Sequence, residues 1–285
     1  MMPPISPVAT DAVTAFNKCL SGLSDVKDAD LKRRMCTSIT ALQSAESSYR
    51  AVAGTCSFFQ LPSSDHMEDV SADEMSALYE KQMSAEKGKA RDIYNAIRAI
   101  SDKCPFCGCQ FTRTVDHYLP KKKYPAFAVN PINLIPACRD CNTHKGTHWP
   151  LTAEEQLIHP YFDDFSTFRW LYAAIKTPTM PIVEYSVHVP SGQPASVGKR
   201  LKKHFDKLKL GELYSLYAAT EVCDISGRLD QLYITGGEVD VASHLSGAAN
   251  SCLAILKNSW KSALYVALAN DSSLITTQGW RYFGQ

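Results

Sequence analysis

Two closely spaced cysteine pairs decide how the middle of this chain folds: C-P-F-C at residues 104–107 and C-R-D-C at residues 138–141. Two residues between cysteines allow a tight turn to present both sulfurs to one ion, and two such turns complete a tetrahedron of thiolates around Zn²⁺. No strand–helix–strand pattern of a redox protein accompanies the pairs, so we expect a structural zinc site. Its predicted ligands are Cys104, Cys107, Cys138 and Cys141.

The predicted zinc site is closed, because four thiolates leave no position for water. Such a site stabilises the fold and takes no part in chemistry. Cys109 is a nearby alternative to Cys107 as a ligand. The two-residue spacing favours Cys107, and Cys109 is not expected to be a zinc ligand.

The whole chain has the composition of an ordinary soluble protein. Its 285 residues, 45% hydrophobic and 21% charged, fit one or two domains and exclude wholesale disorder. The net charge of +1 gives no global sign of a nucleic-acid or membrane partner. The longest apolar stretch is broken by polar residues, and the N-terminus lacks the basic start and apolar run of a signal peptide. We therefore expect a cytoplasmic protein with no membrane partner.

Helical patterns lie on both sides of the cysteine-rich segment. Ser71 and Glu74 have the spacing of a capping box that opens a long helix to about Ile100. Thr152 and Glu155 repeat that spacing. Apolar residues at helical intervals predict most of the remaining elements, and one β-branched run predicts a strand. The expected elements are helices in residues 7–53, 199–209 and 211–270 and a strand in residues 181–189.

These patterns predict a mainly α protein with a small core of two strands and a helix, helical flanking regions, and one or two short strands in the C-terminal part. Its expected parts are a helical N-terminal region (1–100), the core (101–150) and a mostly helical C-terminal domain (151–285). The acidic stretch 65–80 is expected to be a solvated helix start, with a docking surface for a basic partner as the alternative.

The residues between the cysteine pairs carry side chains suited to chemistry. Residues 111–115 read as a strand that ends on Asp116 and His117. A second short strand begins just after Asn133. The segment from 138 to about 146 reads as a helix that carries Asn142, and with it His144 and Lys145.

This order of residues resembles the HNH endonuclease family in its zinc-stapled form, over residues 104–148. The resemblance implies a ββα-metal site in which His117 is the general base. It implies that Asp116 and Asn142 hold a catalytic metal, and that Asn133 stabilises the loop next to His117. The family often has histidine where this chain has Asn142, which makes it an H-N-N variant and favours Mg²⁺ or Mn²⁺ over Zn²⁺ at the catalytic position.

The chemistry of these side chains agrees with that implication. A neutral imidazole can take a proton from water near pH 7. Carboxylate and amide oxygens suit a hard divalent ion, which can stabilise the phosphate and the leaving 3′ oxygen. We expect His117, Asp116 and Asn142 to converge on one scissile bond.

Positive charge is concentrated around the expected site. Residues 101–150 hold seven lysines or arginines and three aspartates, whereas the rest of the chain carries a net negative charge. Basic side chains of this kind hold phosphates without reading sequence. The predicted nucleic-acid contacts are Arg113, Lys121, Lys122, Lys123, Arg139, His144 and Lys145.

The expected function is metal-dependent cleavage of DNA, with RNA not excluded. A non-catalytic zinc-stapled binding module and an RNA-cleaving, toxin-like nuclease are the alternatives. The domain arrangement also resembles that of effector components of bacterial antiphage defence, in which a nuclease core lies between helical regions. Some of these components pair with an ATPase subunit. His159 lies downstream in the sequence H-P-Y-F-D and is expected to pack against the core, with a DNA contact as the alternative.

Overall fold

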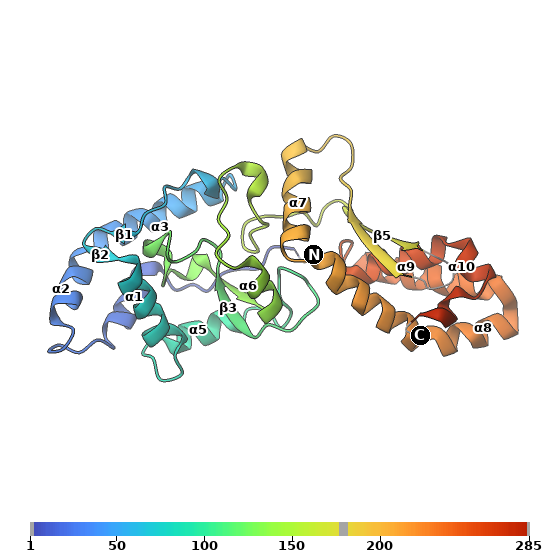
Figure 1. Ribbon diagram of the computed structural model, residues 1–285, viewed down its shortest axis with the longest axis horizontal. Helices are drawn as coiled ribbons and strands as arrows, with labels where there is room; N and C mark the ends of the chain where they lie inside the picture. Colours follow the sequence, from blue (N-terminus) through green and yellow to red (C-terminus); the bar gives the residue numbers. More distant parts are fainter. Residues whose placement is uncertain (1–2, 177–181, 284–285) are drawn as a thin grey trace. The chain divides into compact units, whose positions relative to one another are not determined.

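The computed structural model describes residues 3–176 and 182–283. These residues form two compact units: one of residues 4–163, and one that holds the chain from Asp164 onward. The cysteine-rich segment packs into one unit with the N-terminal helices and with residues 151–163. The predicted mainly α fold with short strands is confirmed (Figure 1).

The unit of residues 4–163 is built on a core of apolar side chains from both the N-terminal helices and the central hairpin. Phe16, Leu42 and Met75 of the helices are buried in it together with Val115 and Leu134 of the hairpin. The elements of this unit are α1 (Ala12–Leu20), α2 (Ala29–Thr37), α3 (Ile39–Ala53), α4 (Ala72–Leu78), α5 (Arg91–Arg98), α6 (Arg139–Lys145), β1 (His66–Met67), β2 (Val70–Ser71), β3 (Thr114–His117) and β4 (Leu134–Ala137).

The helix that begins after Ser71 is shorter than predicted. The capping box is present, with the Ser71 side chain accepting from the Glu74 N–H and the Glu74 side chain accepting from the Ser71 N–H. The helix does not continue to Ile100, because α4 passes into a π-helix at residues 79–84 and the chain then turns before α5. Gly88 allows this turn, since a side chain there would overlap the backbone of Gln82.

The second predicted capping box does not form. Residues 153–155 make one turn of 3₁₀-helix, and the Thr152 side chain accepts no capping hydrogen bond from its N–H groups. The chain is extended again at Gln156, so no longer helix follows for a capping box to begin.

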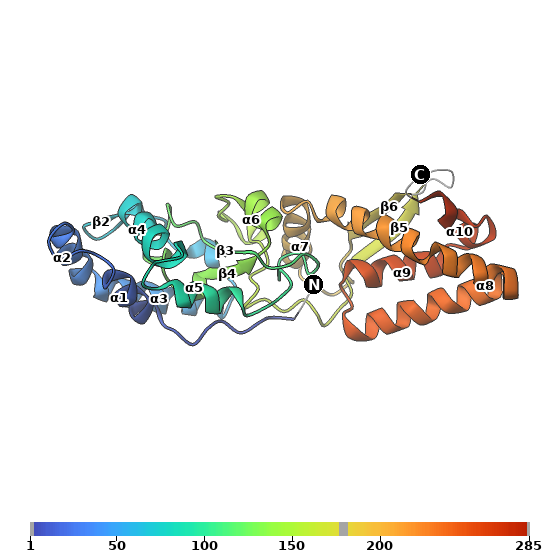
Figure 2. The same ribbon diagram turned by 90° about the horizontal axis from the view of Figure 1, so that it is seen from below.

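The central hairpin pairs β3 with β4 in antiparallel register, so that Asp116 lies opposite Ile135 and His117 opposite Leu134. Helix α6 follows β4 directly, which gives the predicted order of strand, loop, strand and helix. Figure 2 shows the hairpin between α5 and α6. One face of the hairpin therefore packs against α6, and the other packs against the N-terminal helices.

The second unit combines a hairpin with helices. The predicted strand of residues 181–189 is observed from Ile182 to Val187, and residue 181 lies outside the described residues. One or two short strands were expected in this part of the chain, but the position of the partner strand was not predicted. Gly237, with a φ of 65°, interrupts the longest helix. The elements are β5 (Leu171–Lys176), β6 (Ile182–Val187), α7 (Ala195–Lys207), α8 (Leu210–Ile255), α9 (Trp260–Asn270) and α10 (Ser272–Thr276).

Among the described residues, no helix has the length and apolar character needed to cross a membrane.

Candidate metal and nuclease site

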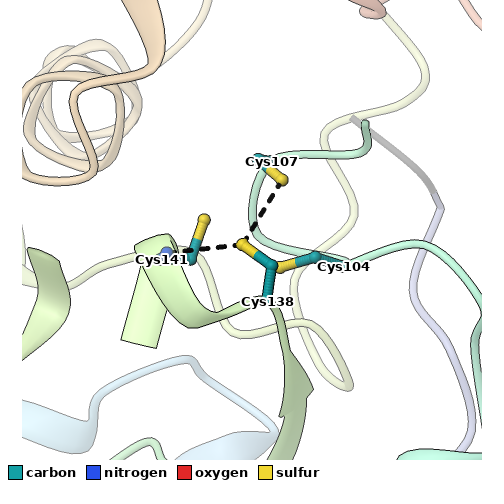
Figure 3. Close-up of side chains that lie close together, drawn as sticks. All are labelled: Cys104, Cys107, Cys138 and Cys141. Atoms are coloured by element: carbon teal, nitrogen blue, oxygen red, sulfur yellow. Dashed lines mark hydrogen bonds between the residues drawn. The ribbon is translucent and has the colours of Figure 1, made fainter. Parts of the chain in front are cut away.

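The four predicted zinc ligands lie together in the structure. The sulfurs of Cys104, Cys107, Cys138 and Cys141 are within 4.8 Å of one another, and all four residues are buried. Figure 3 shows the side chains meeting from two segments, the turn at 104–107 and the start of α6. Sulfurs around a tetrahedral zinc are about 3.8 Å apart, given a Zn–S bond of about 2.3 Å. The Cys107 and Cys138 sulfurs are 4.0 Å apart, which fits one shared ion.

A local hydrogen bond also stabilises each of the two cysteine pairs. The Cys141 N–H points at the Cys138 sulfur at 3.3 Å, and the Gly108 N–H closes the first turn on the Cys104 carbonyl at 2.7 Å. Gly108 has a φ of 70°, a backbone conformation that favours glycine. Cys109 is buried next to the cluster but is not one of the four converging ligands, as expected.

The two predicted ligands of the catalytic metal lie where β3 meets α6: Asp116 on the strand and Asn142 on the helix. Asn142 donates from Nδ2 to the Thr114 hydroxyl oxygen at 3.1 Å. The Thr114 hydroxyl itself donates to the Ala137 carbonyl at 3.1 Å, so its oxygen can only accept from Asn142. These two hydrogen bonds fix the orientation of the Asn142 amide. Its Oδ1 atom is then the one that could bind a metal. Asp116 lies on the same face as Thr114, two residues along the strand.

Asp116 is 7% exposed, and burial raises the pKa of its carboxyl above the ordinary range, opposed by the charge of Lys145. Its Oδ2 accepts no well-aligned hydrogen bond among the described residues, although the Lys145 ammonium lies 3.2 Å away. A buried carboxylate oxygen with an unused lone pair and a half-buried amide oxygen are hard donors that suit Mg²⁺ or Mn²⁺. The residues present therefore fit the metal that the sequence predicts.

His117 lies on the opposite face of β3 and is 9% exposed. Its Nε2 is 2.8 Å from the Ala128 carbonyl oxygen, which can only accept, so Nε2 carries the proton and Nδ1 is the basic nitrogen. Burial lowers the pKa of the imidazole to about 3, partly offset by the bond to Ala128. The ring is therefore neutral at pH 7. Whether the imidazole and the two oxygen donors converge on one bond stays a prediction.

Tyr79 is a site residue that sequence reasoning missed. Its ring, at the start of the π-helix, meets the His117 ring edge-on with centroids 4.4 Å apart. Burial raises the pKa of its hydroxyl, and the neighbouring Asp116 charge adds to that effect. A π-helix inside a longer helix often marks a functional position, but nothing in the local sequence indicated one here.

Asn133 lies at the centre of a buried hydrogen-bond network. Its amide donates to the Leu119 and Phe127 carbonyls and accepts from the Leu119 N–H at 2.8 Å. The Tyr49 hydroxyl lies 3.2 Å from Asn133 Oδ1 and 2.9 Å from His159 Nε2. Because the Tyr161 N–H points at His159 Nδ1, the imidazole donates from Nε2 to Tyr49, and Tyr49 donates to Asn133.

This network gives Asn133 the loop-holding contacts that were expected of it. Leu119 follows His117 by two residues, and Phe127 directly precedes the carbonyl that holds the imidazole. His159 is fully buried among aromatic rings, stacked on Phe58 with centroids 4.9 Å apart. Its packing against the core agrees with the first of the two sequence interpretations. The contribution of Tyr49, from the distant helix α3, was not predicted.

Lys145 has an unexpected environment for a predicted nucleic-acid contact. It is 1% exposed. Its ammonium donates to the backbone carbonyl of His117 at 2.5 Å and faces the Asp116 carboxylate. The side chain therefore points into the protein beside the predicted metal ligands.

The other predicted nucleic-acid contacts lie nearer the surface. Lys121 pairs with Glu80 at 2.9 Å, and Lys122 pairs with Asp73. The Lys123 ammonium lies 5.0 Å from the centre of the Trp149 ring. Acidic residues of the stretch 65–80 thus neutralise two lysines of the loop at residues 121–123, called the lysine loop below. Arg113 and Arg139 are exposed, and His144 is half-buried. Their contacts with nucleic acid stay predictions.

Comparisons with known proteins agree with this geometry. A family model described as HNH endonuclease matches residues 104–148. The chain is similar to protein ea31 of Escherichia phage lambda, with 30% identity over 222 residues that cover 74% of each protein. It is also similar to Septu protein PtuB of Bacillus thuringiensis, with 40% identity over 72 residues, which are 24% of this chain and 27% of that protein. No solved structure matches the chain.

The matched segment runs from the first cysteine of the first pair to just beyond α6, so it contains both the cysteine cluster and the Asp116–His117 strand. The long similarity to the phage protein extends well outside it. The chain belongs to the HNH endonuclease family, in a form whose core is held by four cysteines.

Proposed function

We propose that this chain hydrolyses phosphodiester bonds of DNA as a metal-dependent endonuclease. The observation that supports this most is the state of His117: its Nε2–H is used by the Ala128 carbonyl, and its ring is neutral. Nδ1 is therefore available to take a proton from water. An isolated binding module has no use for an imidazole held in this way.

The proposed reaction uses the two faces of β3 together. A water molecule gives a proton to His117 Nδ1, and its oxygen forms a bond to phosphorus while the bond from phosphorus to the 3′ oxygen breaks. The leaving oxygen takes a proton from solvent. Held by Asp116 and Asn142, Mg²⁺ or Mn²⁺ would neutralise charge on the phosphate and the leaving oxygen. The proposal requires one phosphate at the end of β3 to reach both Asp116 and His117, whose side chains leave the strand on opposite faces.

Cleavage of plasmid DNA by the purified, zinc-loaded chain with Mg²⁺ or Mn²⁺ tests this proposal. His117→Ala is expected to lower the rate by about 10²–10⁴-fold, the usual contribution of a general base. His188→Ala is a matched control, because that exposed histidine belongs to the other unit. Undiminished cleavage by His117→Ala would contradict the assignment. The same assay on RNA decides between the two nucleic acids.

A non-catalytic nucleic-acid-binding module is the second candidate. The exposed Arg113 and Arg139 support binding in either case. A gel shift without cleavage in any divalent ion would favour this candidate.

We also propose an effector role in antiphage defence, with a protein partner such as an ATPase subunit. The similarity to Septu protein PtuB supports this role, as do the helical regions on both sides of the nuclease core. Co-purification of proteins encoded beside this chain's gene, with the full chain as bait, tests it. Recovery of this chain alone would count against a stable partner.

A further inference from the structure

Lys145 is the most deeply buried charged side chain of the candidate site. At 1% exposure its ammonium has lost its hydration, so it needs partners inside the protein. Those partners are the His117 carbonyl at 2.5 Å, the two Asp116 carboxylate oxygens at 3.2 and 3.4 Å, and the Gly146 carbonyl at 3.5 Å. The lysine therefore contacts both members of the Asp-His pair.

The position of Lys145 on α6 relates it to the predicted metal ligands. Lys145 and Asn142 are three residues apart, so they lie on the same face of the helix. That face meets Thr114 and Asp116 on β3. One helix face thus brings the Asn142 amide to Thr114 and the Lys145 ammonium to Asp116, two residues further along the strand.

The charges of the site then limit when a metal can bind. Of the predicted metal ligands and their lysine neighbour, Asp116 contributes one negative charge and Lys145 one positive charge, whereas the Asn142 amide contributes none. The metal-free site is therefore balanced. A divalent ion on Asp116 would add two positive charges beside a buried ammonium, and like charges repel strongly where water is excluded. A phosphodiester brings the negative charge that offsets this repulsion.

We propose that Lys145 is the counter-ion of Asp116 in the metal-free protein, and that it makes binding of the catalytic metal depend on the phosphates of the nucleic acid. This inference rests on the proposed function. Metal and nucleic acid then bind cooperatively, and each raises the affinity for the other by the same factor. The hydrogen bond from Lys145 to the His117 carbonyl makes it a positioning residue as well.

Mn²⁺ binding, measured by the EPR signal of free Mn²⁺, tests the inference without any turnover. The zinc-loaded full chain carries His117→Ala, so that an added DNA duplex stays intact, and the backbone carbonyl that Lys145 contacts is retained. Parallel measurements with Asp116→Asn identify the signal that belongs to this site. We expect the duplex to tighten Mn²⁺ binding by at least about tenfold, within the usual range of coupling between sites.

Lys145→Met removes the charge and keeps most of the buried volume. We expect it to bind Mn²⁺ at least about tenfold more tightly without DNA, with a smaller further effect of the duplex. Lys27→Met, at an exposed lysine of the same unit, is the matched control and should leave the Mn²⁺ affinity unchanged both without and with DNA. Zinc content and thermal unfolding show whether each variant is folded.

Unchanged or weaker Mn²⁺ binding by folded Lys145→Met would overturn the inference. If that variant does not fold, equal Mn²⁺ affinity of the lysine-containing chain with and without the duplex would overturn it as well. Either result can coexist with cleavage that depends on His117, in which case the proposed function stands. Loss of both cleavage and Asp116-dependent Mn²⁺ binding would instead remove the proposed function and the inference with it.

Discussion

The cysteine cluster and the Asp116–His117 strand lie in the same short segment, but they depend on different parts of the chain. The four clustered cysteines come from two short segments, and the hydrogen bonds around them are local. The strand instead depends on Tyr79 and Tyr49 from distant helices and on His159 from beyond the matched segment. The cysteine cluster is therefore formed by local contacts, whereas the geometry of the Asp116–His117 strand depends on contacts with the rest of its unit.

The largest effect should come from removing the zinc. Structural Zn²⁺ contributes about 10–16 kcal/mol in small zinc-binding peptides, and residues 104–148 lose their central crosslink without it. Cys138→Ser, or treatment with a strong chelator, is expected to unfold this segment and abolish cleavage. Zinc content and circular dichroism check the result. A folded, active protein without zinc would show that the cluster is not structural. Cys109→Ser is the matched control and should keep the zinc.

Asn133→Ala should have the next largest effect on stability. It should disturb the Asp116–His117 strand and its loop without disturbing the cysteine cluster. Its buried amide holds Leu119 and Phe127, and each buried group left without a partner costs about 1–3 kcal/mol. We expect a loss of more than about 3 kcal/mol in the free energy of unfolding, with zinc still bound. Urea denaturation together with zinc analysis measures both. Loss of zinc in the same variant would mean that the two regions are not separate.

Tyr49→Phe is a milder change in the same network. It removes only the hydroxyl that joins His159 to Asn133, and it should cost about 1–3 kcal/mol. If the network positions the loop beside His117, kcat should fall while the affinity for DNA stays the same. A variant with lower stability but unchanged kcat would limit the network to a structural role.

Lys122→Ala should have the smallest effect on stability, within about 1 kcal/mol, because its ion pair with Asp73 is exposed. DNA affinity should fall, and the slope of its salt dependence should drop by about 1 if the lysine contacts a phosphate. Asp73→Asn is the matched control: it releases the same lysine and should strengthen binding. Equal affinity in both variants would exclude the lysine loop from the interface.

The contrast between the two regions also explains what the sequence could predict. The cysteine pairs and the capping box at Ser71 follow from local spacing. The order Asp116, His117, Asn133, Asn142 is recognised through its resemblance to the HNH family. The burial of Lys145 could not be predicted, because a lysine is ordinarily exposed. Nor could the contact of Tyr79 with His117, since a tyrosine in a helix reads as ordinary core. Both depend on contacts between segments far apart in the chain.

One measurement tests the account most directly: a crystal structure of the zinc-loaded chain with Mn²⁺ and a DNA duplex that carries a non-cleavable linkage, recorded at the manganese absorption edge. The account predicts one manganese peak within coordination distance of Asp116 Oδ2, Asn142 Oδ1 and a phosphate oxygen, with His117 Nδ1 facing the same phosphorus. A bound duplex with manganese elsewhere, and with the imidazole turned away from the phosphate, would contradict it.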